Sequence, residues 1–121
     1  MSAARPWPEE LRLNRATGTL EIRFEGGDKF ALPAEFLRVN SPSAEVKGHG
    51  GEKPRPVAGK ARVGVKDMVP VGNYAVRIVF DDGHDTGLFS WDYLHELGRD
   101  QIKLWNEYLA RLDHSGMSRE P

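Results

Sequence analysis

The sequence contains no cysteine, which excludes disulfides, thiolate nucleophiles, iron–sulfur ligation and any cysteine-type zinc site. It has no apolar run long enough to span a bilayer. Residues 1–8 lack the apolar stretch of a secretory signal, so we expect a cytoplasmic protein with no membrane contact. The 17 Lys and Arg residues are matched by 18 Asp and Glu residues. Nucleic-acid-binding domains usually carry a clear basic excess, so this balance argues against a nucleic-acid partner.

What is present is the composition of one globular domain. The chain has 121 residues, of which 39% are hydrophobic and 29% are charged. That length supports a single hydrophobic core and is too short for two comfortable domains. We predict a flexible N-terminus over residues 1–9, a folded domain over 10–113 and a disordered tail over 114–121.

Alternation of apolar and polar residues predicts several short strands, mostly paired as antiparallel hairpins. In residues 74–80 the alternation predicts that Tyr74, Val76, Ile78 and Phe80 share the core face. The predicted strands are residues 11–13, 19–24, 29–32, 63–65, 68–71, 74–80 and 86–90.

Helices are predicted at three places. Pro33 can open a short helix over 33–39, since its missing N–H is not needed there. Ser90 is a plausible N-cap for a helix over 91–97 that Gly98 would end. Asp100 would cap a further helix, with one apolar stripe formed by Ile102, Trp105, Leu109 and Leu112. The fold class that follows is α+β, a strand-rich antiparallel domain with one or two C-terminal helices.

Residues 40–62 interrupt these patterns with Ser, Pro, Gly and charged residues, which indicates a long surface loop. Loops of this length inside small domains are usually functional or mobile. The basic residues of the loop are mixed with acidic ones, a pattern typical of a solvated surface.

The densest group of polar side chains is the run from Asp81 to Asp85, Asp-Asp-Gly-His-Asp. Asp82-Gly83 is a pair that suits a two-residue hairpin turn. A polar hairpin tip is one interpretation of this run. The alternative is a zinc or iron site that combines His84 and His49 with Asp82 or neighbouring carboxylates, a mixed nitrogen and oxygen ligand set.

Two segments resemble the gamma-butyrobetaine hydroxylase-like N-terminal domain family, a set of small bacterial proteins. They are residues 37–45, LRVNSPSAE, and residues 74–94, YAVRIVFDDGHDTGLFSWDYL. In carnitine-synthesis hydroxylases this domain precedes an iron- and 2-oxoglutarate-dependent catalytic domain, and elsewhere it is fused to iron–sulfur carrier ATPases. The resemblance implies a role in iron or cofactor metabolism, without oxygenase activity in this chain.

The hydroxylases hold a structural zinc in this domain through three cysteines and one histidine. Carried over position by position, the histidine corresponds to His84 and the cysteines correspond to Ser41, Ser43 and Val46. Neutral hydroxyls are poor zinc ligands, so the resemblance implies that the zinc site has been lost here.

Ser41 and Ser43 are the only candidate nucleophiles near a histidine, and neither lies in a nucleophile-elbow motif. We therefore expect a non-enzymatic module with no required cofactor. It would recognise a protein partner through a surface bearing Asp82, His84, Trp91, Ser41 and Ser43. The alternative is the metal-binding domain built on His84.

Overall fold

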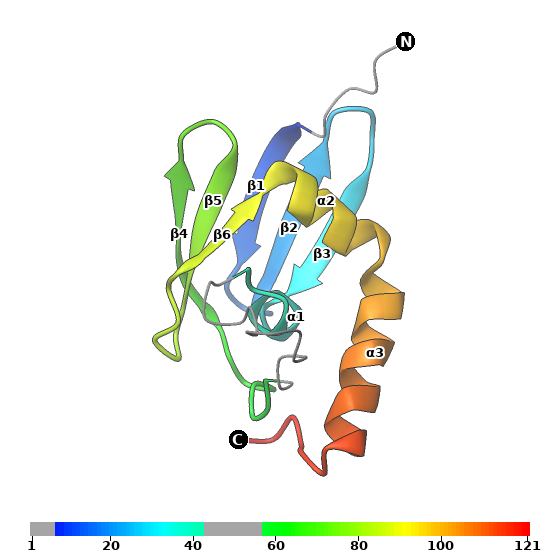
Figure 1. The fold of residues 1–121 in the computed structure, drawn as a ribbon. Helices are drawn as coiled ribbons and strands as arrows, with labels where there is room; N and C mark the ends of the chain where they lie inside the picture. The colour runs from blue at the N-terminus through cyan, green and yellow to red at the C-terminus, as the bar shows by residue number, and fades with distance from the viewer. Residues whose placement is uncertain (1–6, 43–56) are drawn as a thin grey trace, which may run out of the picture.

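The computed structural model describes residues 7–42 and 57–121, which form two small antiparallel sheets and three helices (Figure 1). One sheet has the strand order β1-β2-β3 and the other has the order β4-β5-β6. The strands are β1 (Pro8–Asn14), β2 (Thr19–Phe24), β3 (Lys29–Pro33), β4 (Val65–Val71), β5 (Ala75–Phe80) and β6 (Gly87–Ser90). The helices are α1 (Ala34–Val39), α2 (Trp91–Arg99) and α3 (Gln101–His114). The predicted α+β fold class is confirmed.

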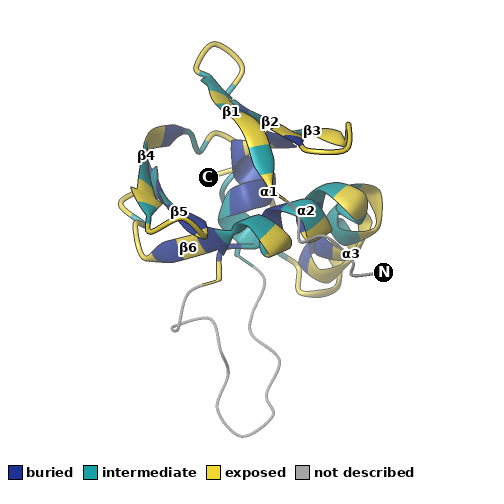
Figure 2. Cartoon of the chain, turned by 90° about the horizontal axis from the view of Figure 1, so that it is seen from above, coloured by how far each residue is buried: buried dark blue, intermediate teal, exposed yellow. Residues whose placement is uncertain are grey.

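The two sheets share one hydrophobic core, which their central strands supply. Leu20, Ile22 and Phe24 alternate along β2 and are buried, and Val76, Ile78 and Phe80 do the same along β5. Helices α1 and α2 add Phe36, Leu37, Leu94 and Leu97 to this core. Figure 2 shows the buried residues concentrated where the sheets and helices face one another. Removal of this apolar surface from water is the main force that holds the two sheets together.

Helix α2 begins and packs as its sequence dictates, but it does not end where we predicted. Ser90 caps it by accepting a hydrogen bond from the backbone N–H of Tyr93. Gly98 lies inside the helix, so the expectation that it terminates the helix was wrong. A Cβ at Gly98 would overlap the ring of Phe30 on β3. The glycine therefore permits close packing of helix on sheet.

Several other local predictions need correction. In place of the predicted strands at 63–65 and 68–71 there is the single strand β4, which begins at Val65 and has an irregularity near Lys66. The turn predicted at Asp82-Gly83 is a six-residue loop between β5 and β6. Tyr74 is 55% exposed because it lies outside the strand, in the turn at 72–74 that joins β4 to β5. Ile102 is 80% exposed, and Tyr108 takes its place with Leu112 on the buried side of α3.

The tail after α3, for which we predicted disorder, contacts the rest of the domain. Its backbone pairs with the segment at 59–61 through hydrogen bonds from Gly59 N to Ser118 O and from Ala61 N to Arg119 O, each 2.9 Å long. The Arg119 guanidinium forms an ion pair with the Glu35 carboxylate on α1. A partner this far away in the sequence has no local signature, so composition alone gives no sign of these contacts.

No helix in the described ranges 7–42 and 57–121 has the length and apolar character needed to cross a membrane.

Candidate functional site

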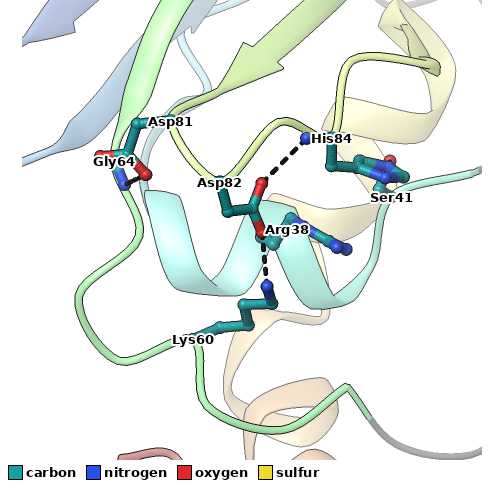
Figure 3. A network of polar contacts seen from close by, with 7 residues as sticks. All are labelled: Arg38, Ser41, Lys60, Gly64, Asp81, Asp82 and His84. Carbon is teal, nitrogen blue, oxygen red and sulfur yellow. Dashed lines mark hydrogen bonds and ion pairs between the residues drawn. The ribbon is translucent and has the colours of Figure 1, made fainter. Parts of the chain in front are cut away.

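The loop between β5 and β6, residues 81–86, is held by a polar network centred on Asp82 (Figure 3). The Asp82 Oδ2 atom accepts hydrogen bonds from Arg38 Nε at 2.8 Å and from Lys60 Nζ at 2.6 Å. Its Oδ1 atom accepts a third, from the backbone N–H of His84, at 3.0 Å. Asp82 thereby joins three segments: the end of α1, the chain before β4, and the loop itself.

The charge state of Asp82 follows from these contacts. Burial by itself would raise the pKa of the carboxyl group, but hydrogen bonds from Lys60, from the His84 backbone and from Arg38 outweigh it and lower the pKa to about 2. Asp82 is therefore an anion at all physiological pH values. A carboxylate with such a low pKa, held by two cations, is suited to fixing a loop and unsuited to proton transfer.

His84 contacts Ser41, the second residue after the end of α1. Its Nε2 atom is hydrogen-bonded to the Ser41 hydroxyl at 2.9 Å, and the Ser41 side chain is buried, with 4% of the residue exposed. Gly87 closes the other side, because a Cβ at that position would overlap Ser41 Oγ. The Ser41–His84 pair is therefore an internal contact between α1 and the loop.

The other two carboxylates of the loop, those of Asp81 and Asp85, make separate contacts. Asp81 Oδ1 accepts a hydrogen bond from the Gly64 backbone N–H at 2.9 Å, so it ties the loop to the start of β4. Asp85 lies 3.9 Å from Arg77 on β5, and both side chains are exposed. Exposed pairs of this kind contribute little to stability. Asp85 is thus an acidic side chain of the loop that a partner could reach.

These residues do not fit the alternative interpretation of a zinc site built on His84 and Asp82. Two ligands about 2.0–2.1 Å from a tetrahedral zinc lie about 3.3 Å apart, whereas Ser41 Oγ and His84 Nε2 are at hydrogen-bonding distance. Asp82 is neutralised by Arg38 and Lys60, which would also repel a cation. Across the described residues, no three His, Cys, Asp or Glu side chains cluster closely enough to hold a metal ion.

The structure brings together some of the predicted site residues and separates others. Asp82, His84 and Ser41 lie in one network (Figure 3). Trp91 lies at the other end of β5, where its backbone N–H donates to Tyr74 O and its indole N–H donates to Asn73 O. Six residues of strand, roughly 20 Å, separate the two ends. His84 and Trp91, which we predicted to share one surface, therefore lie at opposite ends of β5.

Ser43 and His49 lie outside the described residues. A metal site that uses His49 stays a prediction.

Two residues of the network were missed by the sequence analysis. Arg38 lies in the Leu-Arg-Val-Asn segment that carried the family resemblance. The sequence drew attention to this segment, but it did not show that Arg38 binds Asp82. Lys60 lies in a charged loop among other lysines and arginines, and no local pattern distinguishes it. Its contact with Asp82 depends on how residues 57–64 pass beside the hairpin.

The family is shown by sequence comparison. The model of the family described as "Gamma-butyrobetaine hydroxylase-like, N-terminal" matches residues 11–95. The chain belongs to this family. The matched range includes α1, the loop at 81–86 and most of α2, so the Asp82 network lies inside the family domain. Among curated proteins, no sequence matches the chain.

Solved structures agree with this assignment. Two solution NMR structures are 48% and 49% identical to this chain, with TM-scores of 0.83 and 0.82. They cover 98% and 100% of this chain, which in turn covers 93% and 90% of theirs.

A crystal structure from Acidithiobacillus ferrooxidans is 38% identical over 75% of this chain and 91% of that one, with a TM-score of 0.64. It is described as a protein of unknown function from the DUF971 family.

Proposed function

We propose that this domain is a non-catalytic accessory module that binds a protein partner through the loop at 81–86 and the adjoining end of α1. The observation that carries the proposal is the triple engagement of Asp82 by Arg38, Lys60 and the His84 backbone. These contacts fix an exposed loop in one conformation before any partner arrives. Such preorganisation reduces the entropy lost on binding and is a general feature of recognition surfaces.

The geometry of Ser41 supports a non-catalytic role. A hydroxyl hydrogen-bonded to an imidazole is the first requirement of a nucleophile and its base. Here the hydroxyl belongs to a buried residue and lies against Gly87. A substrate carbonyl would have to displace β6 to reach Ser41 Oγ. The pair therefore favours a structural contact over acyl transfer.

The chemistry of the partner follows from the exposed part of the loop. Asp81, Gly83, Asp85 and Thr86 are exposed, and Leu88 on the following strand is 41% exposed. An acidic rim beside an apolar side chain suits a partner surface that presents basic groups around an apolar contact. The family description refers to the N-terminal part of a hydroxylase-like protein. The partner class we propose is therefore a protein of iron or 2-oxoglutarate oxygenase metabolism.

The test is quantitative affinity capture with three purified proteins: the wild type, Asp85→Arg and Glu107→Arg. Asp85 lies on the loop, whereas Glu107 is an exposed residue of α3 and is the matched charge-reversal control. A specific partner should be depleted about tenfold or more by Asp85→Arg, about 1.4 kcal/mol of binding free energy, and retained by Glu107→Arg.

Two results would contradict the proposal. One is a set of captured proteins that Asp85→Arg leaves unchanged. The other is turnover of a substrate by the purified domain that His84→Ala abolishes.

A further inference from the structure

A second polar site, separate from the loop at 81–86, surrounds the buried carboxylate of Glu35 on α1. Glu35 is 6% exposed, and its Oε2 atom accepts a hydrogen bond from the Tyr108 hydroxyl of α3 at 2.9 Å. Trp105, one turn earlier on α3, packs its ring against that of Tyr108, with the ring centroids 5.2 Å apart. We call the group of side chains formed by Glu35, Trp105 and Tyr108 the Glu35 pocket.

The Glu35 pocket holds a guanidinium group from the chain's own tail. Arg119 Nε donates to Glu35 Oε2 and Arg119 Nη2 donates to Glu35 Oε1, both at 2.8 Å. The guanidinium carbon lies 5.3 Å from the centroid of the Trp105 ring. A bidentate carboxylate and an aromatic face are the two features that distinguish an arginine site from a general cation site.

The protonation states agree with this geometry. The hydrogen bond from Arg119 to Glu35 raises the pKa of the guanidinium. Burial, together with the hydrogen bond to Glu35, raises the pKa of Tyr108, so its phenol remains a donor. The pocket thus combines a negative charge, a fixed donor and an aromatic wall.

The rest of the tail is held by two backbone hydrogen bonds and one exposed ion pair. The backbone N–H groups of Gly59 and Ala61 donate to the carbonyls of Ser118 and Arg119. The outer ion pair of Arg62 with Glu120 is 3.6 Å long and largely exposed. Main-chain hydrogen bonds with one specific side-chain pocket are the pattern by which extended peptides are recognised.

We propose that the Glu35 pocket and the N–H groups of Gly59 and Ala61 form a recognition site for an arginine in an extended segment of a protein partner, with Arg119 as its resident occupant. Any extended segment can satisfy the two N–H groups, whereas the buried carboxylate of Glu35 demands a cation in the pocket. Segments with few buried contacts, such as the mostly exposed residues 115–121, open more readily than core elements, so release of the tail makes the site available.

The pocket should discriminate between arginine and lysine. A lysine ammonium is a point charge and cannot donate to both Glu35 oxygens in the planar arrangement seen for Arg119. The sequence gives no sign of this site. Glu35 and Arg119 are 84 positions apart, and neither belongs to a motif.

The experiment measures binding of a fluorescent seven-residue peptide with the sequence of residues 115–121. The receptor is full-length Arg119→Ala, in which the pocket lacks its occupant. The matched control peptide carries alanine in place of its arginine, and a third peptide carries lysine. The control receptor is the double variant Glu35→Gln/Arg119→Ala, which keeps the shape of the pocket and removes its charge.

We expect the arginine peptide to bind Arg119→Ala at least tenfold more tightly than either other peptide. It should bind at least tenfold more weakly to the double variant and to the wild type, whose pocket is filled. Equal binding of the three peptides, or unchanged binding by the double variant, would overturn the site. Equal binding by the wild type would overturn the role of Arg119 as its occupant.

Should Arg119→Ala fail to fold, full-length Arg119→Lys takes its place as the receptor. The same order of affinities is expected, because lysine occupies the pocket less well than arginine. Both receptors keep Asp82, Asp85 and the loop at 81–86 unchanged. A negative result here therefore leaves the proposed partner surface at that loop unaffected, and the converse also holds.

Discussion

Asp82 is the residue on which the loop at 81–86 depends, and its low pKa has a consequence for stability. The folded carboxyl has a pKa of about 2, whereas an unfolded aspartate titrates near 3.9. As the pH falls, the unfolded state takes up the proton first. The stabilisation by Asp82 is therefore fully present above about pH 4 and is lost as the pH falls toward 2.

We expect Asp82→Asn to lower the free energy of unfolding at pH 7 by about 1 kcal/mol, a figure reduced to allow for solvent screening of the network. The difference from the wild type should shrink toward zero near pH 2. Denaturant unfolding at several pH values measures it. Asp113→Asn, on the exposed end of α3, is the control and should show no such pH-dependent loss. A pH-independent difference for Asp82→Asn would contradict the assignment.

The contact between Ser41 and Gly87 supports a second prediction at the scale of single residues. Gly87→Ala places a methyl group against Ser41 Oγ, and overpacking of this kind costs about 1–3 kcal/mol. In a Ser41→Ala background the hydroxyl is gone, so the same substitution should cost at least about 1 kcal/mol less. Thermal or chemical unfolding of the four proteins gives the coupling energy. Strictly additive effects would show that the two residues do not touch.

The sequence indicated which residues belong to the site, but it did not show which of them contact one another. Asp82, His84 and Ser41 were all predicted as site residues, and the structure places them in one network. The hypothesis that Asp82 and His84 are metal ligands did not include Arg38 and Lys60, which neutralise Asp82. Those contacts join segments 22 and 44 positions apart, beyond the reach of local patterns.

At the scale of elements, helix α3 shows both the value and the limit of periodicity. The spacing of apolar residues identified a helix and one of its buried residues, Leu112. It could not show that the Ile102 side chain faces water, with 80% of the residue exposed. The apolar stripe therefore begins later on the helix than its composition indicates.

This difference predicts unequal effects of two substitutions on the same helix. Ile102→Gln should change the free energy of unfolding by less than about 0.5 kcal/mol, because the side chain is already in water. Leu112→Ala should cost about 2–4 kcal/mol, because it leaves a cavity where the side chain was buried. Urea unfolding of both variants measures the contrast. Comparable losses would mean that Ile102 is covered in solution.

The strands were predicted better than the connections between them. Alternation placed β2 and β5 correctly because each has one buried face. The loop at 81–86 was mistaken for a two-residue turn because Asp-Gly has the same local preference in both settings. Its actual shape is set by the hydrogen bonds of Asp81 and Asp82 to other segments.

At the scale of the whole molecule, stability should not depend on zinc. Ser41 and His84 satisfy each other, and no metal cluster is present among residues 7–42 and 57–121. We expect the melting temperature to shift by less than about 1 °C when either equimolar zinc or a chelator is added, since a metal that bound only the folded state would raise it. Differential scanning calorimetry decides the matter. A large zinc-dependent rise that His84→Ala removes would restore the metal-binding hypothesis.

The division of the strands into two sheets has a consequence for how the native protein opens. Strand pairing links β1 to β2 and β2 to β3 on one side, and β4 to β5 and β5 to β6 on the other. No pairing between the two sets is found in the part of the chain that the structure describes. Local fraying of one hydrogen-bonded ladder therefore breaks no bond of the other. Amide hydrogen exchange in D₂O should show two protection classes, centred on β2 and β5, that merge only in global unfolding.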